Sequence, residues 1–196
     1  GEYVAGADDI NETNFTVSTV SIEENGSREP INYVMPPGVE RESNFGTTNY
    51  VFQNEQSLEL NVANLLDGDA VGVFKTTDFD FRQYKRIKMY AHAEKMVDNE
   101  DLEYGDLTAF IRIGSDFTDN YYEYEVPLEF TEWYSTDSDS IWPELNNFDI
   151  SLDELVNVKH NRNIAMRQPG TQLSLQLPYV EYIGKNKVTV LGSPSI

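Results

Sequence analysis

Two runs of sequence decide the fold: KTTDFDFRQYKRIKMYAHAE at 75–94 and DLTAFIRIGSDFTDNYYEYEVPL at 106–128. Between them they hold three stretches in which apolar and polar residues alternate. An alternation of period two predicts β-strands with one buried face. The residues expected on the buried side are Ile87, Met89, Ala91 and Ala93, then Leu107, Ala109, Ile111 and Ile113, and finally Tyr122, Tyr124, Val126 and Leu128.

The remaining elements follow from capping and alternation. Ser151 and Glu154 form a capping box, in which each side chain reaches the other's backbone amide, and this predicts a short helix near 152–160. Alternating leucines predict one further strand over 173–177, and Val188 and Val190 predict a last one. About eight strands with one crossover helix indicate a mostly β fold, a jelly-roll or galactose-binding-like β-sandwich.

The domain organisation follows from the distribution of polar residues. Residues 1–30 are a polar N-terminal segment with room for one strand, and residues 31–196 are expected to form a single jelly-roll-like domain. Two long polar stretches, 97–106 and 134–147, are expected to be exposed loops. Loops of this length in a compact domain often carry function.

The composition excludes several classes of function. The chain has 14 Lys and Arg against 34 Asp and Glu, a net charge of −20, which disfavours binding to nucleic acid or to anionic lipid. Such a charge suits cations, basic partners or simple solubility. Cysteine is absent, which excludes disulfides and thiol chemistry. No apolar run is long enough for a membrane helix, and Gly1 is expected to be a processed end or the start of a piece of a longer protein.

One acidic region could bind a metal ion. Residues 113–158 contain twelve acids and no Lys or Arg. The tightest group is Asp116, Asp119 and Asn120, whose oxygens suit a structural Ca²⁺ ion, although no dedicated calcium motif is present. A solvated acidic face is the competing interpretation. No pair of carboxylates has a spacing that singles it out for glycoside hydrolysis.

Aromatic residues suggest one possible binding surface. Tyr121, Trp133, Tyr134 and Trp142 could offer aromatic faces to a sugar, whereas the alternation places Tyr122 and Tyr124 inward. Edge packing of a long loop is the competing interpretation for the two tryptophans. No nucleophile elbow, phosphate loop or ligand-spaced histidine pair occurs, so the sequence predicts no enzyme and no cofactor apart from the possible calcium ion.

Several longer phrases of the sequence are distinctive, and together they cover most of residues 31–167. DLTAFIRIGSDFTDNYYEYE at 106–125 is the most specific of them. The others are YVMPPGVERE at 33–42, NEQSL at 54–58, DGDA at 67–70, KTTD at 75–78 and RQYKR at 82–86. These phrases resemble one known family, the SprA (Sov) proteins of Bacteroidetes.

The resemblance implies a role in protein export and gliding motility. SprA-like proteins are the giant outer-membrane translocon of the type IX secretion system, so other secretion components and transiting cargo are the implied partners. The segment would be a soluble, non-enzymatic domain of that membrane-embedded parent, at the outer membrane or cell surface on an unresolved face. It would cap or line the pore or dock a partner, and its sandwich would lack a last strand near 187–196. A glycan-binding module of a cell-surface protein is the alternative.

Overall fold

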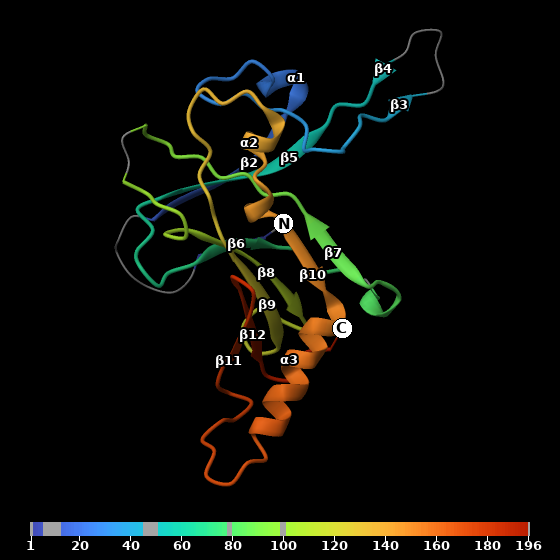
Figure 1. The fold of residues 1–196 in the computed structure, drawn as a ribbon, viewed down its shortest axis with the longest axis vertical. Coiled ribbons are helices and arrows are strands. Elements are labelled where there is room, and N and C mark those ends of the chain that lie inside the picture. Colours follow the sequence, from blue (N-terminus) through green and yellow to red (C-terminus); the bar gives the residue numbers. More distant parts are fainter. Residues whose placement is uncertain (1, 6–12, 45–50, 78–79, 99–100, 196) are drawn as a thin grey trace. The chain divides into compact units, whose positions relative to one another are not determined.

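The computed structural model describes residues 2–5, 13–44, 51–77, 80–98 and 101–195. The chain forms two compact units, Gly1–Phe79 and Asp80–Ile196. The described part is mostly β, with small antiparallel sheets and three α-helices, and Figure 1 shows how these elements follow one another along the chain. The mostly β class is therefore confirmed. No jelly-roll sandwich is identified among the described residues, and the predicted domain boundaries stay a prediction.

The described residues of the first unit form three two-stranded ribbons and one helical turn. In the ribbon of β2 and β5, cross-strand partners such as Val17 and Leu60 share one face, and both remain more than two-fifths exposed. The turn α1 begins at Ser21, whose hydroxyl accepts from the Glu24 amide. The antiparallel pairs are β1 (Glu2–Ala5) with β6 (Val71–Phe74), β2 (Asn14–Ser21) with β5 (Gln56–Ala63) and β3 (Ser43–Asn44) with β4 (Val51–Phe52), and α1 spans Ile22–Asn25.

The second unit contains a four-stranded antiparallel sheet in the order β11-β12-β9-β8, together with a separate β7-β10 ribbon. Helix α3 contacts β10, β11 and β12 (Figure 1). The described elements of the second unit are η1 (Phe81–Gln83), β7 (Arg86–Met89), β8 (Thr108–Gly114), β9 (Tyr121–Pro127), α2 (Ser138–Ile141), η2 (Glu144–Asn146), β10 (Phe148–Ser151), α3 (Leu152–Ala165), β11 (Tyr179–Ile183) and β12 (Asn186–Leu191).

The core of the second unit lies between one face of the sheet and the layer of α3 and β10. The alternation in β9 puts Val126 at full burial, and its neighbours on that face are Tyr122 and Tyr124, as predicted. Each apolar side chain of this size contributes roughly 1.5–3 kcal/mol when it leaves water. The buried cluster comprises Tyr122, Tyr124, Val126, Phe148, Ile150, Leu152, Leu155, Val158, Val188 and Val190.

Three predicted elements differ from the structure. The predicted helix runs further than 160, because no helix-breaking residue occurs before Pro169 and Gly170. The first alternating run forms a strand only at Arg86–Met89, and Glu94 makes an isolated parallel bridge with Thr131. The predicted strand over 173–177 is wrong: this segment is irregular, with a turn at 175–177, and β11 begins after Pro178.

Candidate functional site

The face of the four-stranded sheet that points away from the core carries charged pairs, and we call it the outer sheet face. The register places Arg112 directly opposite Glu123, and Lys187 directly opposite Glu125. The Arg112 Nη2 and Glu123 Oε2 atoms are 2.5 Å apart, and Lys187 Nζ lies 2.7 Å from Glu125 Oε2. The hydrogen bond with Glu125 raises the pKa of Lys187. Both basic side chains are therefore neutralised by this chain's own carboxylates.

Tyr121, one of the predicted binding residues, lies beneath a cation on this face. The Arg112 guanidinium carbon is 3.9 Å from the centre of the Tyr121 ring, a cation–π contact. Arg112 also donates to the Phe117 carbonyl. Tyr121 is only 9% exposed, and burial raises the pKa of its hydroxyl. The Tyr121 ring therefore stacks on the protein's own arginine.

The predicted calcium residues form a tight turn between β8 and β9. Asp116 Oδ1 accepts backbone N–H groups from Thr118, Asp119 and Asn120 at 3.1, 2.6 and 2.9 Å. Asp116 Oδ2 accepts the Asn120 side-chain amide at 2.9 Å, and Asn120 Oδ1 accepts the Ser193 amide. These donors, led by the Asn120 amide, hold the pKa of Asp116 well below its usual range. The three residues are brought together, but N–H donors already occupy the oxygens of Asp116.

We expect Asp116→Ala to lower the melting temperature by several degrees at neutral pH, because four N–H groups lose their acceptor. Since folding depresses the pKa of Asp116, its stabilisation is present above the ordinary value of 3.8 and is lost as the pH falls below it. The difference between variant and wild type should therefore shrink in acid. Thermal melts between pH 7 and pH 3, with the exposed Asp101→Ala as control, measure this difference.

The same melts test the calcium prediction, which the turn geometry leaves open. A midpoint that falls on adding a chelator supports a structural ion at Asp116, Asp119 and Asn120. An unchanged midpoint, together with the loss in Asp116→Ala, assigns Asp116 to holding the turn. Equal melts of Asp116→Ala and Asp101→Ala would contradict that role.

The remaining predicted binding residues lie near the segment between β9 and β10. Trp142 is buried at 7% exposure and packs against His92, with ring centres 5.8 Å apart. The Trp133 indole N–H donates to the Lys95 carbonyl at 3.2 Å, and its ring meets Tyr134 edge-on at 6.3 Å. Tyr134 is 70% exposed and has a left-handed backbone, with φ at 66°. The structure thus brings Trp133 and Tyr134 together, and of the four predicted aromatics only Tyr134 is mostly exposed.

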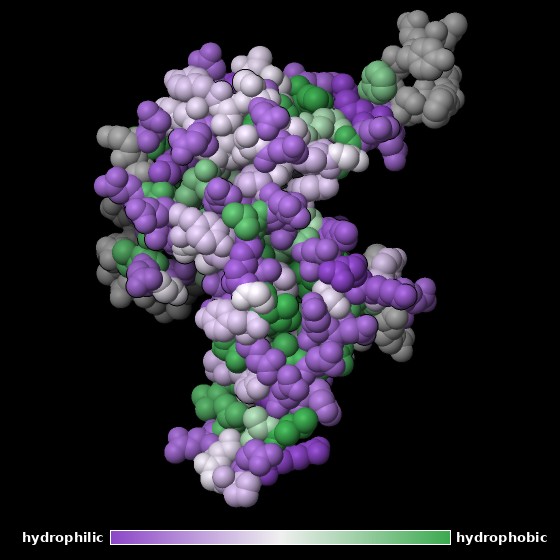
Figure 2. Space-filling view, in the orientation of Figure 1, coloured by the Kyte–Doolittle hydropathy of each residue, from purple (hydrophilic) through white to green (hydrophobic). Residues whose placement is uncertain are grey.

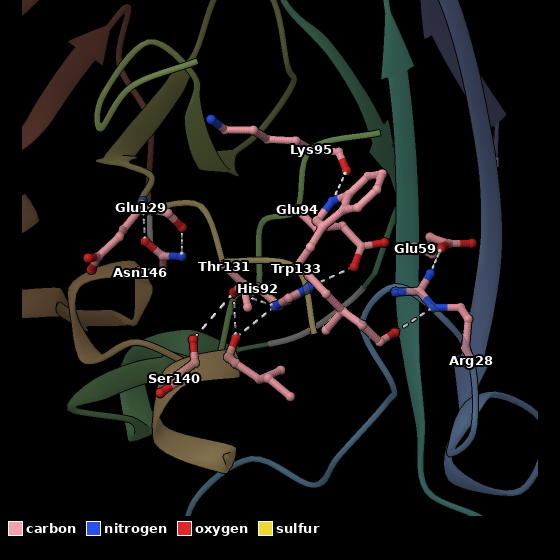
Figure 3. A network of polar contacts seen from close by, with 12 residues as sticks. Arg28, Glu59, His92, Glu94, Lys95, Glu129, Thr131, Trp133, Ser140 and Asn146 are labelled. Atoms are coloured by element: carbon pink, nitrogen blue, oxygen red, sulfur yellow. Dashed lines mark hydrogen bonds and ion pairs between the residues drawn. The ribbon is translucent and has the colours of Figure 1, made fainter. Parts of the chain in front are cut away.

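A polar network around His92 ties the segment after β9 to the segment after β7 (Figure 3). His92 Nδ1 lies 2.7 Å from the Ile141 carbonyl oxygen and 3.1 Å from Thr131 Oγ1. His92 Nε2 lies 3.3 Å from Glu94 Oε2. The Thr131 amide donates to the Ala93 carbonyl at 2.8 Å.

The network resembles a nucleophile, base and acid in composition, but its hydrogen bonds assign it another role. A carbonyl oxygen only accepts, so Nδ1 of His92 carries the proton and donates it to Ile141. That nitrogen therefore has no lone pair with which to take a proton from Thr131. Thr131 is also only 4% exposed, which closes it to substrate. The geometry indicates a structural tie that holds the 131–141 segment in place.

Two buried polar side chains were missed by the sequence analysis. Asn146, fully buried, pairs with the backbone of Glu129 through both atoms of its amide, with distances of 2.7 and 2.8 Å (Figure 3). Arg162, 1% exposed, donates to the Gly192 carbonyl at 2.6 Å, and burial lowers its pKa. The sequence places Arg162 only among basic residues near a helix end, and nothing in it marks Asn146.

Among the described residues, no three histidine or acidic side chains form a group that could hold a metal ion. In the described part of the chain, no helix combines the length and the apolar character needed to cross a bilayer.

Together, the fold and these contacts define a mostly β domain with an acidic surface and polar clusters that serve the structure. A family model described as motility related/secretion protein, SprA_N, matches residues 1–196. The chain therefore belongs to the SprA_N family, which confirms the resemblance drawn from the sequence. No curated protein matches the chain.

Proposed function

We propose that this chain is a non-enzymatic domain of the type IX secretion translocon, acting in protein export and gliding motility. It docks a partner subunit or caps or lines the pore, at the outer membrane or cell surface. Membership of a motility and secretion family supports this proposal. The mostly β fold adds no support, because a fold class does not by itself specify a function.

The observation that carries the proposal is an acidic surface on which several of the basic side chains pair with carboxylates of the same unit. Arg86, Arg112 and Lys187 each pair with a carboxylate of the same unit. By contrast, the side chains of Glu132, Asp139 and Glu144 are exposed and engage no hydrogen bond or ion pair among the described residues. Such a surface repels acidic cargo and attracts basic partners, which suits a passage or docking surface.

We expect neutralising Glu132→Gln, Asp139→Asn and Glu144→Gln together in the full-length protein to reduce the cargo that reaches the cell surface. The physical reason is that this part of the surface loses three negative charges while the packing around Trp142 and Asn146 is kept. Surface cargo is measured by protease accessibility on intact cells, and assembly with partner subunits by co-purification.

The matched control removes three exposed acids from the first unit: Glu40→Gln, Asp67→Asn and Asp69→Asn. Both variants change the net charge equally, so a secretion defect confined to the first variant supports a local role for its surface. Normal secretion and normal partner assembly in both variants would count against the proposal. A deletion of 134–147 is less informative, because it removes the buried residues Ile141, Trp142 and Asn146.

A glycan-binding module is the alternative function, and the exposed ring of Tyr134 beside Trp133 favours it. Titration calorimetry with a panel of sugars, using Tyr134→Ala as the binding-deficient variant, tests it. Trp142→Ala is a poor probe, since Trp142 is buried and its loss would disturb the packing around His92. Absence of heat at millimolar sugar removes this alternative.

A further inference from the structure

Strand β11 forms one edge of the four-stranded sheet and pairs only with β12 in the described structure. An edge strand presents a row of unpaired N–H and C=O groups, which can pair with another chain. The other edge strand, β8, differs in its exposure: residues 109–113 are half-buried along its whole centre. In β11, half-buried and exposed residues alternate, and Val180 and Tyr182 are 40% and 69% exposed.

The edge lacks three of the features by which proteins block strand addition, namely a bulge, a lysine and an internal proline, and its one charged residue is Glu181. Its register with β12 is continuous from Tyr179 to Ile183, without a bulge, and it contains no lysine or internal proline. Lys185, the nearest lysine in sequence, donates to the Leu145 carbonyl and lies 5.7 Å from the Tyr104 ring centre, and Lys187, which lies opposite Tyr182 in β12, pairs with Glu125. The charge of each lysine is therefore engaged away from the edge.

Exposed apolar side chains also occur in the segment just before the edge strand. Leu175 and Leu177 are 37% and 48% exposed just before β11. Figure 2 shows hydrophobic surface over the segment that leads from α3 into β11. These leucines, which the sequence assigned to a strand of their own, precede the exposed Val180 and Tyr182 by a few residues, and water-exposed apolar side chains that gather in this way often mark an interaction site.

The charges on and around β11 select the kind of chain that would pair there. Among the described residues, the Glu181 carboxylate bonds only to neutral groups, the Tyr179 hydroxyl at 2.8 Å and the Asn161 amide at 3.2 Å. A basic residue directly opposite Glu181 would neutralise it. A second copy of this chain carries a net charge of −20 and is repelled, so a basic partner is favoured.

We propose that β11 is a strand-addition site for an extended, basic segment of a partner protein. Apolar residues of that segment contact Val180 and Tyr182 on one face of the sheet, and a Lys or Arg faces Glu181 on the other. Backbone hydrogen bonds supply the affinity and the alternate side chains the specificity, as in other β-augmentation complexes. The proposal rests on the proposed docking function only for the biological identity of the partner.

The probe is a fluorescent peptide in which lysine and valine alternate, titrated against the 196-residue chain by anisotropy. Two control peptides separate the contributions: one with glutamate in place of lysine, and one with every second amide N-methylated, which keeps the charge but blocks strand pairing. We expect the unmodified lysine peptide to bind at least about tenfold more tightly than either control.

Val180→Lys places a charge on the edge, and Val156→Lys, on a 49% exposed valine of α3, is the control with the same net charge. We expect Val180→Lys to weaken binding at least about tenfold and Val156→Lys to leave it near the wild-type value. Tyr182→Lys, at the more exposed position, provides the test should Val180→Lys fold poorly.

Three results would overturn the proposal. The first is equal binding of the lysine peptide by Val180→Lys and Val156→Lys. The second is equal binding of the N-methylated and the unmodified lysine peptides, which would indicate charge attraction alone. The third is self-association of the wild type that Val180→Lys abolishes. Because these measurements are made without secretion, their failure would leave the secretion proposal standing. A normal secretion result for the acidic-surface variant would, in turn, leave strand addition untouched.

Discussion

Asn146→Ala is expected to lower the free energy of unfolding by about 2–3 kcal/mol, because two backbone hydrogen bonds are lost at once. The Asn146 amide accepts from the Glu129 amide and donates to the Glu129 carbonyl, in the manner of a neighbouring strand. Because the Asn146 side chain is completely buried, no other described group takes its place in these two hydrogen bonds. Urea unfolding followed by fluorescence of the two tryptophans measures the loss.

The adjacent asparagine provides the matched control. The Asn147 side-chain oxygen is buried without a hydrogen-bond partner among the described residues. Asn147→Ala removes this unsatisfied atom, so its effect is expected to stay within about 0.5 kcal/mol of the wild type or to be slightly stabilising. Equal losses at the two positions would contradict the pairing role of Asn146.

Asn146→Asp separates the two hydrogen bonds. The carboxylate still accepts from Glu129 but faces the Glu129 carbonyl where the amide donated, so it is buried with one repulsive contact. Burial favours the protonated form of such a carboxyl, and a protonated carboxyl can donate to the carbonyl. The destabilisation is therefore expected at neutral pH and should diminish as the pH falls toward about 4, the ordinary range of an aspartic acid.

The sequence predicts which face of a strand is buried better than it predicts which strand pairs with it. The alternation of Tyr122, Tyr124 and Val126 is local, and it correctly predicts which side of β9 is buried. Likewise the capping box at Ser151 correctly predicts the start of α3, since both partners lie within one helical turn. The alternation over 87–94 is equally clear, yet only Arg86–Met89 pair with β10, because pairing depends on a strand distant in sequence.

The candidate site was predictable as a set of residues but not in its roles. Tyr121 and Trp142 are aromatic residues of the expected region, but Arg112 covers the first and the packing around His92 encloses the second. Contacts between a side chain and a backbone group distant in sequence produce no regular spacing of residue types, so the sequence does not reveal them. Asn146 bonds to Glu129 across 17 residues, and no spacing rule connects them.

Arg162→Ala is expected to cost about 3–4 kcal/mol, the second large effect. The side chain is 1% exposed, so its removal leaves a cavity and also deprives the Gly192 carbonyl of a donor 2.6 Å away. Arg167→Ala, at an exposed position near the end of the same helix, is expected to stay within about 0.5 kcal/mol.

Arg162→Met distinguishes packing from charge. The guanidinium bonds to neutral acceptors, the Gly192 carbonyl and the Asn163 side chain, and no carboxylate forms an ion pair with it among the described residues. Its burial therefore carries a desolvation cost, which methionine removes while filling most of the same volume. We expect the free energy of unfolding to fall by about 1–2 kcal/mol, less than in Arg162→Ala. The cost of leaving the Gly192 carbonyl unpaired is partly offset, because the desolvation cost of the buried guanidinium is removed. A loss in Arg162→Met as large as in Arg162→Ala would contradict this balance.

The same arginine holds the segment that follows β12, and amide exchange reports on this directly. Lys159 Nζ donates to the Pro194 carbonyl at 2.6 Å, and the Ser193 amide donates to Asn120 Oδ1. Three side chains thus hold residues 192–194, Lys159 and Arg162 from α3 and Asn120 from the turn before β9. We expect Arg162→Met to accelerate hydrogen exchange at Ser193, and adding Lys159→Met to accelerate it further, because each carbonyl contact limits local opening. Unchanged exchange at Ser193 in the double variant would show that the Asn120 contact alone holds this segment.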